Sequence, residues 1–234
     1  MNRSIADLRS VGGRWFFVAA AIGVAIIILA GFVPNYTMRL LRHDRNLIWL
    51  VHLHGLFSAS WIALFLVQAL LIARRRVDLH RRLGVAGGVL AAAVVCLGAA
   101  TLWHAAVRQG PRLNATHGAR YVDMLIAFDG AGLLVFAALV AAAITLGRHA
   151  PWHKRLMLLA ALSLLGPAFG RITAYASGMQ DDNPLAVLLL CAVCVIACAA
   201  IDTVRLRRLH PAFVWGGGLV LAMYVATYVA KTLL

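Results

Sequence analysis

The sequence is poor in charged residues, and above all in acidic ones. Of its 234 residues, 13% are charged and 63% are hydrophobic, whereas a soluble domain is usually about a quarter charged and about half apolar. This composition excludes a soluble globular enzyme and a disordered chain. The four cysteines imply no disulfide framework, because all of them fall inside apolar segments: Cys96, Cys191, Cys194 and Cys198.

Several motifs that would identify an enzyme class are also missing. The chain has no P-loop, no Gly-x-Gly-x-x-Gly after a strand, no His-Glu-x-x-His and no Gly-x-Ser-x-Gly. It has no Cys-x-x-Cys-His, which excludes covalent attachment of a c-type haem. Whether the protein is an enzyme is therefore left open by its sequence.

Long apolar runs are abundant, and they predict an all-α fold with seven transmembrane helices. A helix needs about 20 apolar residues to cross the hydrocarbon core. No loop is long enough for a soluble domain, so residues 1–234 are expected to form one helical bundle. The longest connection, residues 107–120, is predicted to be a loop because of its glycine, proline and asparagine content. The predicted spans lie near 15–35, 47–72, 84–106, 121–147, 154–176, 184–203 and 211–233.

The distribution of Lys and Arg predicts the orientation of the bundle. Basic residues concentrate in cytoplasmic loops, and 14 of the 22 fall on one side, which places the N-terminus inside and the C-terminus outside. The excess of basic residues is explained by this rule and by contact with anionic lipid headgroups, so no nucleic-acid partner is expected. The expected location is the bacterial inner membrane. The inner set is Arg3, Arg9, Arg14, Arg74, Arg75, Arg76, Arg81, Arg82, Arg148, Lys154, Arg155, Arg205, Arg207 and Arg208.

A short repeat links the three inner turns. His80 and His153 are 73 residues apart and each is followed by two basic residues and a leucine, while His210 takes the equivalent place before Pro211. The repeat predicts three parallel out–in–out hairpins after one extra N-terminal helix. The histidines either begin helices among lipid headgroups or converge as metal or haem ligands. In the second case the surrounding cations suit haem propionates better than a metal ion.

The predicted outer third of the bundle is unusually polar, and polar residues inside a membrane are functional candidates. His52 and His54 are two residues apart, about 200° around a helix, so both cannot face one ligand. A cofactor site is expected from one of them with His104 and Arg171. Asp123 and Asp129 extend this pocket, unless Arg171 with either of them forms only a structural ion pair. Deeper in the bundle, Gln68 is expected to make an interhelical hydrogen bond and to belong to the same polar pocket.

Several of these segments resemble a known group of proteins. The run from His52 through Trp61, Gln68 and LHRRLG, followed by HKRLMLLA and GPAFGR, resembles a family of uncharacterised multi-pass bacterial inner-membrane proteins. More distantly, the layout resembles the cytochrome b561-like membrane cytochromes, whose helices carry paired histidines for b haems near each face. That resemblance implies an outer set of His52, His54 and His104 and an inner set of His80 and His153.

The sequence thus predicts an integral inner-membrane protein with a periplasm-facing histidine site, binding b-type haem or a metal for electron transfer. Two alternatives remain: a transporter or small-molecule-binding protein, and an accessory subunit that associates with other membrane proteins. No spacing in the sequence decides among the three.

Overall fold

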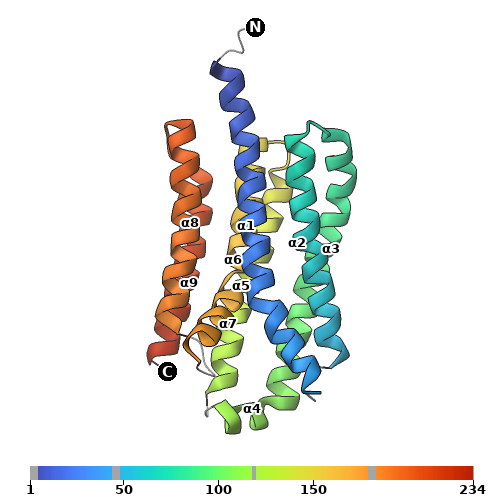
Figure 1. Cartoon of the computed structure of the whole chain (residues 1–234), viewed down its shortest axis with the longest axis vertical. Helices are drawn as coiled ribbons and strands as arrows, with labels where there is room; N and C mark the ends of the chain where they lie inside the picture. Colours follow the sequence, from blue (N-terminus) through green and yellow to red (C-terminus); the bar gives the residue numbers. More distant parts are fainter. Residues whose placement is uncertain (1–4, 44–47, 118–119, 179–182, 234) are drawn as a thin grey trace.

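The computed structural model describes residues 5–43, 48–117, 120–178 and 183–233, and the regular secondary structure in these ranges is helical. Seven helical segments are long and apolar enough to cross a membrane, which confirms the predicted number of spans. α1 begins and α9 ends at opposite ends of the bundle (Figure 1). The elements are α1 (Ile5–Leu41), α2 (Trp49–Ala73), α3 (Val77–His104), η1 (Ala105–Gln109), α4 (Gly110–His117), α5 (Tyr121–Thr145), α6 (Ala150–Ser163), α7 (Gly166–Ser177), α8 (Pro184–Leu206), η2 (Phe213–Gly217) and α9 (Gly218–Leu233).

Three helical hairpins follow α1, as the repeat predicts. The α2–α3, α5–α6 and α8–α9 turns all lie at the end of the bundle where α1 begins (Figure 1). We call this the N-terminal end, and the opposite one the C-terminal end. α1 joins the hairpins, because it contacts α2, α6, α7 and α8. The assignment of the N-terminal end to the cytoplasm stays a prediction from the charge distribution.

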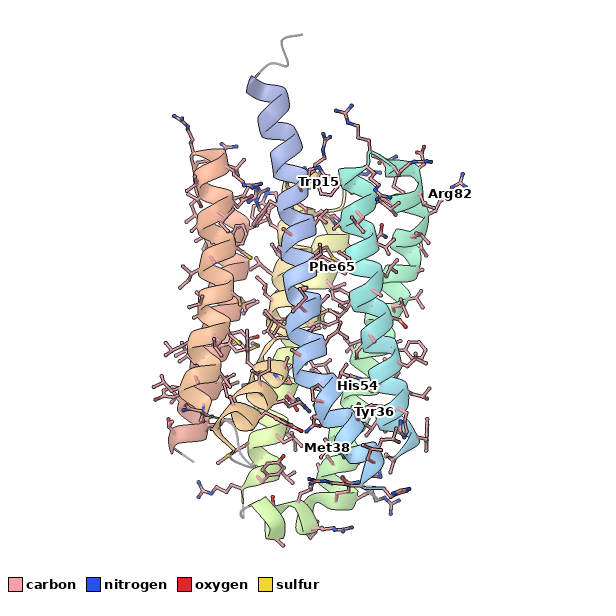
Figure 2. The ribbon with its side chains drawn as sticks, viewed as in Figure 1. Trp15, Tyr36, Met38, His54, Phe65 and Arg82 are labelled. Carbon is pink, nitrogen blue, oxygen red and sulfur yellow. The ribbon has the colours of Figure 1, made fainter. Side chains whose placement is uncertain are left out.

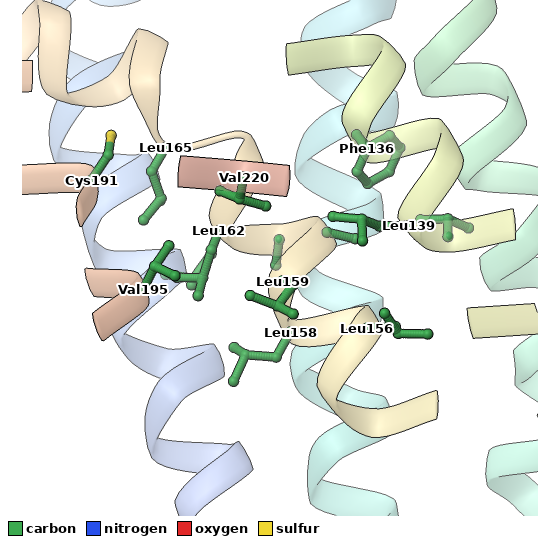
Figure 3. Packing of buried hydrophobic residues seen from close by; sticks show 14 of the residues in the cluster. Phe136, Leu139, Leu156, Leu158, Leu159, Leu162, Leu165, Cys191, Val195 and Val220 are labelled. Carbon is green, nitrogen blue, oxygen red and sulfur yellow. The ribbon is translucent and has the colours of Figure 1, made fainter. Parts of the chain in front are cut away.

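The fifth span, Ala150–Ser177, is the centre of the bundle. Within its most apolar stretch 67% of the residues are buried, against 17% in four of the other spans. Its leucines belong to one hydrophobic cluster with side chains of α5, α8 and α9, and Figure 3 shows Leu159 and Leu162 among Leu139, Val195 and Val220. The side chains of this span therefore pack among several helices.

This central span is divided into two helices, where the sequence predicts one segment. α6 ends at Ser163 and α7 begins at Gly166. Pro167 lacks an amide N–H, and its ring would clash with the carbonyl of Ser163 in a continuous helix. The Tyr224 hydroxyl of α9 spans the interruption, donating to the Leu162 carbonyl at 2.8 Å and accepting from the Gly166 amide at 3.2 Å. The break is thus kept inside the protein with its backbone groups satisfied.

The prediction of a loop at residues 107–120 is wrong for most of its length. The third span continues through the π-helical segment η1 into α4, which ends at His117. Pro111, which lacks a backbone N–H, is the second residue of α4 and follows η1 closely. Asn114 then accepts a hydrogen bond of 2.9 Å from the Val122 amide at the start of α5. Residues 118–119 lie outside the described ranges.

Candidate histidine site at the N-terminal end

The first turns of α6 contact four different parts of the bundle. Successive residues of a helix point about 100° apart, so neighbouring side chains here reach different partners. The Trp152 ring packs against His210, with ring centroids 5.4 Å apart. The Lys154 ammonium lies over the Phe17 ring of α1, 4.8 Å from its centroid. His153 faces α3 and Arg155 faces α8.

Arg155 and Asp202 form a buried ion pair between α6 and α8. The guanidinium donates from Nε to Oδ2 and from Nη2 to Oδ1, both at 2.8 Å. Its Nη1 donates to the Pro151 carbonyl at 2.7 Å. The two side chains are 2% and 5% exposed. This pair was not predicted from the sequence, where Arg155 stands among the loop cations. The signal available was the lone Asp202 among basic residues near the end of a span.

His80 of α3 and His153 of α6 face each other between the first and second hairpins. Their ring centroids are 6.1 Å apart and their planes are 86° from parallel. His153 Nδ1 lies 2.8 Å from the Ala143 carbonyl of α5. A carbonyl can only accept, so this contact places the proton on Nδ1 and leaves the Nε2 lone pair of a neutral imidazole available. The two histidines that the repeat aligns in sequence are thus neighbours in space.

Gln68 of α2 completes this group, which we call the histidine site: Gln68, His80 and His153. Its Nε2 donates to the His80 backbone carbonyl at 3.1 Å, which confirms the predicted interhelical hydrogen bond. Two buried atoms of the site, Gln68 Oε1 and His80 Nδ1, have no hydrogen-bond partner among the described residues. Buried polar groups are usually paired, and leaving one unpaired is costly. The site therefore has hydrogen-bonding or ligating capacity that its own chain does not use.

Glycines line α3 next to the histidine site. Gly84 and Gly88 follow His80 by one and two helical turns and so lie on the same face. A Cβ at Gly84 would meet only the Gln68 amide nitrogen, at 3.8 Å, and one at Gly88 only the Ile144 Cδ1, at 3.7 Å. These glycines leave space along α3 that a side chain would fill.

The third predicted inner ligand, His210, is held in another way. Its Nδ1 accepts a hydrogen bond of 3.1 Å from the Ala212 amide and so caps the start of the last span. Burial, with the positive charge of Arg155 as a further contribution, lowers the pKa of His210 below its ordinary value. In the described ranges, no three side chains of His, Cys, Asp or Glu lie close enough to hold a metal ion together. A three-histidine inner centre of His80, His153 and His210 has no structural support.

The predicted outer histidines diverge, as their spacing requires. The Tyr36 hydroxyl of α1 is hydrogen-bonded to His52 Nδ1. His54 instead faces α3, where a Cβ at Gly98 would come within 3.2 Å of its Cε1. Figure 2 shows Tyr36 and His54 at similar depth. His104 is six residues beyond Gly98, about 9 Å along α3 and about 120° from it around the axis. The shared ligation of a cofactor by these histidines stays a prediction.

The other predicted polar residues lie on α5 and α7. Arg171 donates from Nη1 to the Pro167 carbonyl at 2.6 Å, and its guanidinium lies over the Phe32 ring, 4.3 Å from the centroid. Asp123 is exposed in the first turn of α5, and Asp129 is half-buried further along the same helix. The ion pair of Arg171 with either aspartate stays a prediction. Arg171 in this arrangement ties α7 to α1.

The fold and the site together define the class of this chain, a multi-pass helical membrane protein. Comparison of the chain with protein-family models, with curated proteins and with solved structures gives no match.

Proposed function

We propose that this membrane protein binds a b-type haem at the histidine site, with His80 and His153 as the iron ligands, and serves in electron transfer. The observation that carries the proposal is the pairing of two imidazoles from different hairpins, 6.1 Å apart between ring centroids. Neutral imidazole nitrogens bind metals at about 2.0 Å, so two histidine rings at this separation could hold one metal ion between them.

The surroundings of the pair fit such a group. Metal-bound histidines nearly always donate the other ring N–H to a carbonyl, a carboxylate or water, and His153 does this toward Ala143. The glycines of α3 leave space beside His80. Arg81 follows His80 in the second turn of α3, and its charge suits carboxylates such as haem propionates. The bound iron would supply one-electron chemistry; the chain would hold it, orient its ligands and balance its charge.

The haem is assigned to the histidine site at the N-terminal end rather than to the predicted outer histidines. In the outer set, His52 is hydrogen-bonded to Tyr36 and His54 faces Gly98. These two histidines therefore point to different neighbours. A second haem at the C-terminal end, using His54 or His52 with His104 and Arg171, is a separate part of the haem hypothesis. The location in a bacterial inner membrane, with the N-terminal end in the cytoplasm, is also part of the proposal.

The test is an absorption spectrum of the protein purified in mild detergent from haem-replete cells, oxidised and then reduced with dithionite. We expect a Soret band, with sharp α and β bands after reduction. His80→Ala and His153→Ala should abolish or shift these bands. His149→Ala is the matched control, since His149 is exposed in the turn before α6, and its spectrum should be unchanged. A colourless wild-type protein, or bands that persist in both site variants, would overturn the proposal.

A second candidate function, a carrier or binding protein for a small polar molecule, is favoured by one observation. Discontinuous membrane helices are typical of transporters, and α6–α7 is discontinuous at the centre of this bundle. Gln68 Oε1 and the Nε2 of His153 are acceptors, so such a ligand would carry hydroxyl or amide donors. The result expected for this second function is thermal stabilisation of a colourless protein by that ligand. The stabilisation should be lost in Gln68→Ala.

A further inference from the structure

A cluster of basic side chains surrounds two phenylalanines of α1 at the N-terminal end. Phe16 and Phe17 pack edge to face, with ring centroids 5.0 Å apart. Besides Lys154, the Arg155 guanidinium lies 6.0 Å from the centroid of Phe17. Arg205 of α8 lies 5.2 Å from the centroid of Phe16. Cations of α6 and α8 are thereby gathered on one side of α1.

Asp202, the acidic residue beside these cations, is already paired with Arg155. Asp202 uses both carboxylate oxygens for Arg155, and the charged groups that act on Lys154 are Arg155 and Asp202. The negative charge of Asp202 offsets one of the positive charges of Lys154 and Arg155, so these two neighbours together keep an excess of positive charge. Like charges at this separation repel, and an anion between them would relieve the repulsion.

Arg14 adds a donor on the same side of α1. It precedes Phe17 by three residues, so it lies on the same face, one helical turn nearer the N-terminal end. Its Nε is buried and has no hydrogen-bond partner among the described residues. A guanidinium N–H that is removed from water and unpaired is costly, and a phosphate oxygen is a partner that Arg binds well.

The depth of the cluster points to the bilayer surface. Trp15, next to Arg14, is 48% exposed, and Figure 2 shows it toward the N-terminal end of the bundle. Exposed tryptophans are typical of the headgroup level of a membrane. Basic pockets between membrane helices at this level bind the head groups of anionic lipids.

We propose that Arg14, Lys154 and Arg205, between α1, α6 and α8, bind the phosphate of an anionic phospholipid headgroup. The Phe16 and Phe17 rings form the apolar floor on which the cations are held. Arg155 stays with Asp202 and fixes α6 against α8, so that Lys154 is presented to the lipid. This site is separate from the histidine site and does not depend on haem binding.

The test is the thermal stability of the delipidated, detergent-solubilised full chain, titrated with phosphatidylglycerol, phosphatidylcholine or inorganic phosphate. We expect saturable stabilisation by phosphatidylglycerol and none by the other two. Lys154→Gln and Arg14→Gln should each raise the lipid concentration for half-maximal stabilisation about tenfold, since one charge-assisted hydrogen bond contributes that much. Arg148→Gln, in the exposed turn before α6, is the control and should behave as wild type.

Three results would overturn the proposal. One is unchanged lipid titration in both Lys154→Gln and Arg14→Gln. Another is equal stabilisation by phosphatidylcholine, which would show that a net negative lipid is not recognised. A third is stabilisation by inorganic phosphate at the same concentrations, which would show that the site binds soluble phosphate rather than a lipid headgroup. If Arg14→Gln fails to fold, Lys154→Gln and Arg205→Gln decide, because both residues lie at the rim of α6 and α8 rather than within α1.

Discussion

Asp202 of α8 accepts two hydrogen bonds of 2.8 Å from the guanidinium of Arg155 on α6. This bidentate pair is nearly inaccessible to solvent, and it fixes the helix that carries His153 and Lys154. Because each oxygen of the carboxylate binds a different nitrogen, the pair sets the orientation of α6 as well as its position. Both candidate sites at the N-terminal end therefore depend on its geometry.

Replacing Asp202 by Asn should strongly destabilise the protein, because it leaves the Arg155 charge buried without a counter-charge. Breaking a buried ion pair from one side costs about 3–5 kcal/mol. The free energy of unfolding in detergent, measured by denaturant titration, checks this. Asp78→Asn, at an exposed position in the first turn of α3, should have little effect. The double variant Arg155→Met/Asp202→Leu should recover much of the loss, and equal stability of Asp202→Asn and wild type would contradict the assigned role.

Tyr224→Phe should weaken the junction of α6 and α7 without creating a cavity. The change removes only the hydroxyl that binds the Leu162 carbonyl and the Gly166 amide. Two backbone groups would then be unpaired inside the bundle, which costs about 1–3 kcal/mol for each buried group that is not satisfied. The measurement is the melting temperature, and hydrogen exchange of the Gly166 amide should accelerate. Tyr175→Phe, at an exposed side chain on α7, should melt as wild type does.

Gly31→Ala should separate α1 from α7. A Cβ at Gly31 would lie 2.5 Å from the Ala168 carbonyl oxygen and 2.7 Å from its Cα, and these are backbone atoms that cannot turn aside. We expect a loss of roughly 1–3 kcal/mol in unfolding free energy, as for other overpacked positions. Gly23→Ala on the same helix meets nothing within 4 Å, and it should be neutral or slightly stabilising. If both variants have the same stability, the close approach of the two backbones is wrong.

His210 should make stability depend on pH in the acidic range. Its pKa in the folded state lies below the ordinary value of 6.5, through burial first, so the unfolded chain binds the proton more readily. Its contribution is complete above about pH 6.5 and is lost as the pH falls below that value toward the folded pKa. Protonation also ends the acceptance of the Ala212 N–H by Nδ1. His210→Asn keeps an acceptor that does not titrate, so its melting temperature should fall less between about pH 7.5 and about pH 5.5 than that of wild type. An identical fall in both proteins would exclude His210 as the cause.

The seven spans, the hairpins and the different directions of His52 and His54 were predictable from the sequence. Each follows from a local property: the length of an apolar run, the position of basic turns, or the angle between two residues of one helix. The break at Ser163–Gly166 was only partly predictable. Gly166 and Pro167 indicate a weak point, but whether the helix stops there depends on a distant hydroxyl, that of Tyr224, to satisfy the freed backbone groups.

By itself the sequence determined that this chain is a seven-span helical bundle, because apolar length and helical periodicity are properties of each segment. Only the tertiary structure decided which polar residues meet. It joined Arg155 to Asp202 across 47 positions and His80 to His153 across 73, and within the described residues it brought no third ligand such as His210 to that pair. In a bundle of similar apolar helices, partners are chosen by the packing and rotation of whole helices, and no spacing along the chain encodes that choice.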